Sequence, residues 1–266
     1  MEIEQTLKNW FDGTCDLLED HFQEHRQKTQ LENTVNASVS VVQNYFWSIL
    51  KLLDKNQADQ HIQPAKALLR CLYQLTSRIT WILMGASADE RKDRIEQLEK
   101  KSLEDESKLA GKILEVYKND ARENTRIALQ RHEKARRDFS KRIENLNACG
   151  TERLPSPIEI LKEVFGGEYG EPREGPGASE LVPIRGWPDL HKAVHPDYIA
   201  LNSTISNSEN AQSYDGDTRE DVAGIKYECC ACVHRFLKEI YKFYGFVNFD
   251  TIDNDFRELG NAIVSR

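Results

Sequence analysis

The sequence predicts an all-α protein, a helical bundle with a long charged helical arm and a Pro/Gly-rich connecting loop. About half of residues 89–147 are Asp, Glu, Lys or Arg, and this run contains no proline and a single glycine, Gly111. Such a run consists of helix-forming residues but cannot bury itself. In the segments on both sides of it, apolar residues recur at helical spacing. The prolines and glycines of residues 150–190 predict an irregular connection.

Two amphipathic helices are predicted at the start of the chain, over residues 1–30 and 34–54. In both segments large apolar side chains return every three or four residues, which places them on one face of a helix. The apolar positions are Leu7, Trp10, Phe11, Leu17, Leu18 and Phe22 in the first segment, and Val35, Val39, Val42, Phe46, Ile49 and Leu53 in the second.

The most apolar predicted helix covers residues 64–84. Pro64 suits the first position of a helix, where a missing N–H costs nothing, and Gly85 is expected to end it. A helix that is apolar almost all round belongs in the centre of a bundle.

The charged run predicts a second kind of helix, over about 103–147, with a length of roughly 65–70 Å at about 1.5 Å per residue. A narrow stripe containing several alanines follows it at spacings of three, four or seven, from Ala110 to Leu146. We expect a coiled-coil-like contact along this stripe. Residues 89–102 are expected to form a separate helix, which could be the antiparallel partner of the 103–147 helix. The stripe also predicts a homo-oligomer, most simply a dimer, through the arm.

After the arm, the pattern predicts short helices at 157–165, 193–206 and 253–264, and a clear amphipathic helix at 219–245. The predicted organisation is a helical core from residues 1–88 and 190–266, a charged arm at 89–149 and a linker at 150–189. The order of the loop at 166–190 is left open by the sequence.

Charge is unevenly distributed in this acidic chain, whose formal net charge is -8. From Arg122 to Arg142 there are eight basic and three acidic residues, whereas the first 32 residues hold three basic and eight acidic ones. These regions could pair, within one chain or across a dimer; alternatively, the basic region is an edge that contacts RNA. The acidic N-terminal segment and the polar residues within 33–50 predict a cytoplasmic protein with no membrane partner, and the six cysteines are expected to be free thiols.

The first candidate site is the row Arg70, Gln74 and Arg78 on the most apolar helix. Because an unpaired buried charge is costly, two guanidiniums on a central helix must find acceptors. They either line a pocket for an anion or phosphate, or pair with acidic side chains of other helices. Tyr198, Asn202 and Asn207, in a segment rich in hydrogen-bonding groups, could face this pocket; alternatively they are capping and turn residues.

The second candidate pair is Arg126 and His132. An Arg followed by a His after four to six residues resembles the motif of the HEPN superfamily of helical ribonucleases. The resemblance implies metal-free RNA cleavage, with the imidazole moving a proton and the arginine stabilising charge on the phosphate. Six residues correspond to about 120° around an ideal helix, and chance on a solvated helix explains the pair equally.

The cysteines Cys229, Cys230 and Cys232 with His234 form the third candidate. A structural zinc needs four converging ligands, which one helix cannot supply, and a thiol on an apolar stripe packs as a small hydrophobe. We therefore expect no metal and no cofactor.

Two further segments resemble a family of uncharacterised, mostly bacterial helical proteins, known as a domain of unknown function and sometimes found near phage-defence genes. These are LLRCLYQLTSRITWIL (68–83), followed by a charged insertion, and YIALNSTISNS (198–208), followed by a long helix. The family tends to have Glu at the place of Gln74 and His near Ser206 and Asn207. The resemblance therefore implies a pocket that binds without that acid–base chemistry.

Three functions are consistent with these patterns. The first is a defence- or toxin-type protein that acts on or binds RNA or nucleotides through the arginine-lined pocket. The second is a non-catalytic interaction protein whose charged arm mediates oligomerisation or partner docking. The third is a HEPN-like ribonuclease that uses Arg126 and His132.

Overall fold

A computed structural model describes residues 3–24, 29–53, 58–120, 122–166 and 214–264. The described residues are helical or lie in turns between helices, with no strand among them, so the all-α prediction is confirmed. The chain forms two compact units, one from residues 1–84 with 157–266 and the other from residues 85–156. The described helices are α1 (Ile3–Glu24), α2 (Gln30–Leu52), α3 (Ala58–Leu83), α4 (Ala88–Tyr117), α5 (Glu123–Ala148), α6 (Pro157–Gly166), α9 (Tyr214–Tyr244) and α10 (Phe249–Val264).

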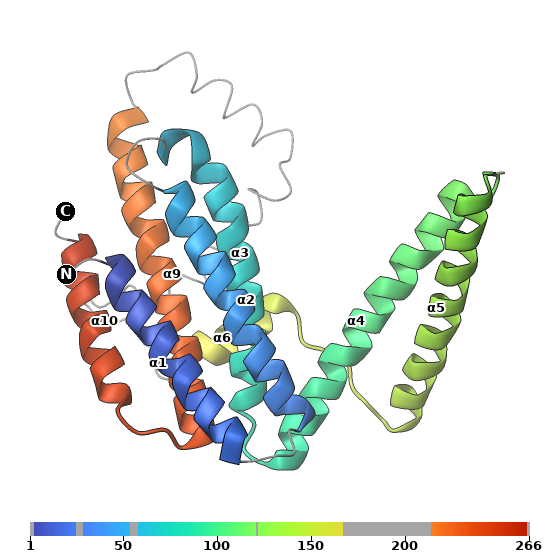
Figure 1. The fold of residues 1–266 in the computed structure, drawn as a ribbon, viewed down its shortest axis with the longest axis horizontal. Coiled ribbons are helices and arrows are strands. Elements are labelled where there is room, and N and C mark those ends of the chain that lie inside the picture. Colours follow the sequence, from blue (N-terminus) through green and yellow to red (C-terminus); the bar gives the residue numbers. More distant parts are fainter. Residues whose placement is uncertain (1–2, 25–28, 54–57, 121, 167–213, 265–266) are drawn as a thin grey trace. The chain divides into compact units, whose positions relative to one another are not determined.

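In the first unit α3 is the central helix. It packs against α2, α9 and α6, while α10 covers another side of α9 (Figure 1). The side chains that α3 buries are large and apolar, including Leu69, Leu72, Tyr73, Ile79 and Ile82. Their distribution around the helix requires neighbours on several sides, which explains the central position.

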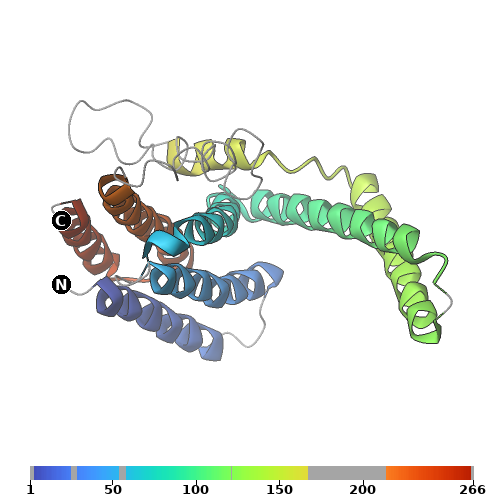
Figure 2. The ribbon, with the colours of Figure 1, turned by 90° about the horizontal axis from the view of Figure 1, so that it is seen from above.

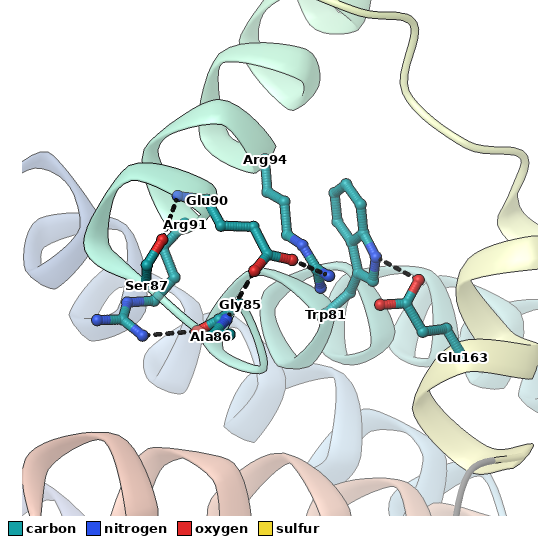
Figure 3. A network of polar contacts seen from close by, with 8 residues as sticks. All are labelled: Trp81, Gly85, Ala86, Ser87, Glu90, Arg91, Arg94 and Glu163. Atoms are coloured by element: carbon teal, nitrogen blue, oxygen red, sulfur yellow. Dashed lines mark hydrogen bonds and ion pairs between the residues drawn. The ribbon is translucent and has the colours of Figure 1, made fainter.

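Polar contacts at helix ends fix two of these elements. Thr29 and Glu32 form a capping box at the start of α2, in which the Thr29 hydroxyl accepts from the Glu32 amide and the Glu32 carboxylate accepts from the Thr29 amide. The indole Nε1 of Trp81, on α3, donates to Glu163 Oε2 of α6 at 2.8 Å (Figure 3). This bond attaches the short α6 helix to α3.

The second unit is a helical hairpin in which α4 and α5 pack against each other as antiparallel helices (Figures 1 and 2). The Ser87 hydroxyl caps α4 by accepting from the Glu90 amide. Glu90 also accepts from the Ala86 amide and from Arg94, at 2.8 and 2.6 Å (Figure 3). The first turn of α4 is therefore held by charge-assisted hydrogen bonds.

The expected single helix over 103–147 is wrong, because the charged run turns back on itself between Tyr117 and Glu123. Asp120 makes this turn: its carboxylate accepts from both the backbone amide and the guanidinium of Arg122. Asp and Asn favour such local bonds over helix continuation. A separate helix at 89–102 is also wrong, since α4 is continuous from Ala88 to Tyr117.

The alanine-containing stripe therefore has a partner within the chain. Ala110 and Leu146 are buried, while Ala135 and Phe139 are half-buried. Because α4 and α5 cover each other, a second copy is not needed to bury this stripe. The homo-oligomer therefore stays a prediction, but the stripe no longer supports it.

The start of α3 also differs from the prediction. Pro64 lies inside α3, which begins at Ala58, rather than at its first position. Helix 157–165 is found as α6, and 219–245 as the longer α9. The expected helix at 193–206 and most of the 166–190 loop lie outside the described residues. None of the described helices is long and apolar enough to cross a membrane.

Candidate functional site

The predicted polar row on α3 lies one helical turn apart, and all three side chains, Arg70, Gln74 and Arg78, are half-buried. Both arginines take part in interactions within the chain. Next to them in the sequence, the Tyr73 hydroxyl donates to Glu228 Oε2 of α9 at 3.3 Å. Burial raises the pKa of Tyr73 well above its usual value, and the Glu228 charge adds to this. This hydrogen bond is a polar contact between the core helices α3 and α9.

The remaining predicted members of this pocket are Tyr198, Asn202 and Asn207. All three lie outside the described residues, so the arginine-lined pocket stays a prediction.

The cysteine cluster belongs to the core. Cys229, Cys230 and Cys232 are buried, and Cys232 Sγ lies 2.7 Å from Thr76 Oγ1 of α3. Burial raises the pKa of Cys230 and of Cys232 to about 12, so these thiols stay protonated at neutral pH, whereas metal binding requires the thiolate. Among the described residues no three His, Cys, Asp or Glu side chains are grouped so that they could hold a metal ion.

His234 contacts α10 rather than the cysteines. Its Nε2 lies 2.6 Å from Asp253 Oδ1, and its ring stacks on Phe256 with 4.3 Å between ring centroids. Burial lowers the pKa of His234 to about 4, although Asp253 acts in the opposite direction. The imidazole is therefore neutral at pH 7, donates to the carboxylate and fastens α10 to α9.

Arg126 and His132 both lie on α5, in the hairpin. The Arg126 guanidinium is exposed and pairs with Glu123, with Nη2–Oε2 at 2.9 Å. The His132 side chain is half-exposed. The structure therefore shows Arg126 paired with a neighbouring carboxylate. The joint role of Arg126 and His132 in RNA cleavage remains a prediction.

A different set of cations stands out on the hairpin. Several basic side chains form ion pairs, for example Arg94 with Glu90 at 2.6 Å and Arg142 with Glu99 at 2.8 Å. Within α4 and α5 themselves, seven others are exposed and, in the part of the chain that the structure describes, have no ion pair; Lys118 and Arg153, outside these two helices, share this property. We call the seven the basic group; they are Lys108, Lys112, Arg131, Lys134, Arg136, Arg137 and Lys141.

Two features of the hairpin gather the basic group. Lys134, Arg137 and Lys141 step by three and four residues along α5, so they share one helix face. Arg136 lies against α4 at Gly111, where a Cβ atom would be 3.6 Å from its Cζ. Because α4 and α5 pack against each other, Lys108 and Lys112 line the same groove as Arg136.

Around Gly111 the two helices leave an open groove of about 630 Å³. Three members of the basic group line it, against one carboxylate, that of Glu115. The complete lining is Ser107, Lys108, Gly111, Lys112, Leu114, Glu115 and Arg136. Such a surface attracts anions, and a guanidinium can bind phosphate or carboxylate with two parallel hydrogen bonds.

The sequence indicated only part of this site. The excess of basic residues from Arg122 to Arg142 marks the α5 side, but Lys108 and Lys112 lie outside that window. Gly111 was the available signal, because a lone glycine inside a strongly helix-forming run often marks a close approach.

Comparisons of this chain with protein-family models, with curated proteins and with solved structures found no match.

Proposed function

We propose that this protein is a non-catalytic interaction protein that docks a polyanionic partner on its α4–α5 hairpin. The observation that supports this proposal is the basic group, seven exposed cations without an ion pair among the described residues. Like charges held together on one short hairpin repel each other, and an anionic partner relieves that repulsion.

The test is retention of the full-length protein on immobilised heparin, a sulfated polyanion, with elution by rising salt. The test variant is Lys134→Gln/Arg137→Gln/Lys141→Gln, which keeps good helix formers and removes three charges. The matched control is Lys8→Gln/Lys92→Gln/Lys101→Gln, which removes two exposed lysines and one half-buried lysine, each paired with an acidic residue four positions later.

We expect the wild type and the control to elute at similar salt concentrations and the test variant at a clearly lower one. Because the net charge of the two variants is equal, a difference between them reports where the charges lie. Equal elution of both variants, or a wild type that heparin does not retain, would contradict the proposal.

A second candidate function, self-association through the hairpin, is favoured by apolar side chains that α4 and α5 leave exposed. Leu109 is 52% and Val116 72% exposed, and they lie seven residues apart, the spacing of a coiled-coil contact face. Ile127 on α5 is also exposed. If this face joins two copies, the wild type sediments as a dimer and Leu109→Gln/Val116→Gln as a monomer, whereas a monomeric wild type at 100 µM would exclude it.

Catalysis has its own test. The metal-free ribonuclease hypothesis requires that purified protein cleave RNA in EDTA and that His132→Ala lose this activity while its thermal unfolding is unchanged. Intact RNA after incubation with the wild type would rule out that activity for the RNA used and leave the binding proposal in place.

A further inference from the structure

The groove around Gly111 has the features of a phosphate site. Arg136 is an exposed residue whose guanidinium lies over Gly111 of α4, with its Cζ 3.6 Å from the place a Cβ atom would take. Lys108 and Lys112, one turn apart on α4, line the same groove together with the Ser107 hydroxyl. Cationic and hydroxyl donors around an open groove are the groups with which proteins contact nucleic-acid phosphates.

The basic group continues from this groove along the hairpin. On the exposed face of α5, Lys134, Arg137 and Lys141 cover about 10 Å at about 1.5 Å per residue. A single small anion would occupy the groove alone and leave these three side chains without a partner. A partner with negative charges repeated every few ångströms fits both places at once, and a nucleic-acid strand has this property.

The character of the surface favours a nucleic acid over an acidic protein. Leu114 is the one large apolar residue among those that line the groove, and the α5 row of Lys134, Arg137 and Lys141 contains no apolar residue, with the carboxylate of Asp138 beside it. Protein–protein interfaces depend on an apolar, often aromatic, centre, whereas binding to a phosphodiester backbone is dominated by charge. The exposed apolar residues Leu109, Val116 and Ile127 do not line the groove.

We propose that the hairpin binds the sugar–phosphate backbone of a nucleic acid, with one phosphate held in the groove by Arg136, Lys108 and Lys112 and neighbouring phosphates contacted by the α5 row. This inference rests on the proposed polyanion docking and names the partner class. No aromatic side chain lines the groove, so bases have no stacking platform there. Binding therefore depends on the backbone and is independent of base sequence.

The experiment measures fluorescence anisotropy of labelled 20-nucleotide probes with the full-length protein in EDTA, from 50 to 300 mM KCl. The probes are single-stranded RNA, single-stranded DNA and duplex DNA, each in two unrelated sequences, which separates the possible sources of phosphodiester. The variants are Lys108→Gln/Lys112→Gln/Arg136→Gln, which removes the groove cations, and Gly111→Glu, which places a carboxylate beside Arg136. The control is again Lys8→Gln/Lys92→Gln/Lys101→Gln.

We expect at least one probe class to bind, equally well in both sequences. In 0.1 M salt the groove variant should raise Kd by about ten- to a hundredfold and flatten the plot of log K against log salt by about 2, as the loss of three backbone contacts predicts. Gly111→Glu should raise Kd at least about tenfold, since its carboxylate repels phosphate and pairs with Arg136. The control should bind as the wild type does.

Three results would overturn the inference. One is retention on heparin that depends on the hairpin without binding of any probe; polyanion docking would then stand, and the partner would be an acidic protein. Another is wild-type affinity in both Gly111→Glu and the groove variant. The third is an equal loss in the control, which would assign binding to net charge rather than to the groove and the α5 row. If heparin too fails to retain the wild type, the proposed function falls together with this inference.

Discussion

The guanidinium of Arg136 lies against the helix backbone at Gly111, within 3.6 Å of the place a Cβ atom would take. This contact joins α5 to α4 at the level where the basic group gathers. Gly111 is the single glycine of the charged run. Its substitution therefore tests two properties together, the helix stability of α4 and the packing of Arg136 at this position.

Gly111→Ala should stabilise the hairpin by up to about 1 kcal/mol, because alanine is the better helix former and its methyl group fits at ordinary contact distance. Gly111→Val should gain less, since a β-branched side chain loses rotamer freedom in a helix and its γ-carbons reach toward Arg136. Hydrogen exchange of α4 amides at increasing denaturant measures the change in hairpin stability in each variant. A hairpin that opens more readily in Gly111→Ala would show that the contact at Gly111 is tighter than described.

The pH dependence of stability should report the burial of His234 between α9 and α10, which outweighs the opposite effect of Asp253 on its pKa. The pKa of His234 is lowered from 6.5 to about 4 in the folded chain, so the unfolded state binds more protons between these values. The contribution of neutral His234 to the free energy of unfolding should therefore be fully present above about pH 6.5. It should be lost as the pH decreases toward 4, which lowers the free energy of unfolding by on the order of 3 kcal/mol. Urea unfolding of the wild type and His234→Gln from pH 4 to 7 measures this, and the variant should lack that part of the slope.

Thiol reactivity should separate the cysteines by burial. Cys15 and Cys149 are exposed, and both should react with a thiol reagent in the native protein. The pKa of Cys15 is raised, by partial burial and by the charges of Asp12 and Asp16, so its reaction should be slow at pH 7 and accelerate with pH. The buried thiols Cys229, Cys230 and Cys232 should react only on unfolding. Fast native labelling of any of these three, located by peptide mass spectrometry, would contradict the described packing of α9.

The two units should differ in local stability. In α3 most positions from Leu69 to Leu83 are buried or half-buried, whereas in α5 Leu146 is the one buried side chain. Fewer buried apolar contacts mean a lower free energy of local opening. Amides of 126–141 should therefore exchange faster than those of 69–83 in native-state hydrogen exchange. Equal protection of the two segments would indicate that the hairpin is covered by a partner, such as a second copy.

Several helices could be predicted from the sequence because their signals are local. The apolar spacing from Val35 to Ile49 and from Leu68 to Leu83 marks α2 and α3, and the apolar character of the latter also predicts its central position. These properties depend on residues a few positions apart, which helical periodicity brings together. The positive charge of the Arg122–Arg142 region is likewise a local property.

The sequence by itself determined that this protein is helical and that one segment is rich in unburied charge. Only the tertiary structure decided that this segment folds back at Asp120, because helix propensity alone would also permit a continuous rod. The same folding selects which carboxylates reach which cations, pairing Arg142 with Glu99 across 43 positions and leaving the basic group without ion pairs among the described residues. The groove at Gly111 follows from this pairing of α4 with α5, since it depends on contacts between residues 25 positions apart, which no local pattern specifies.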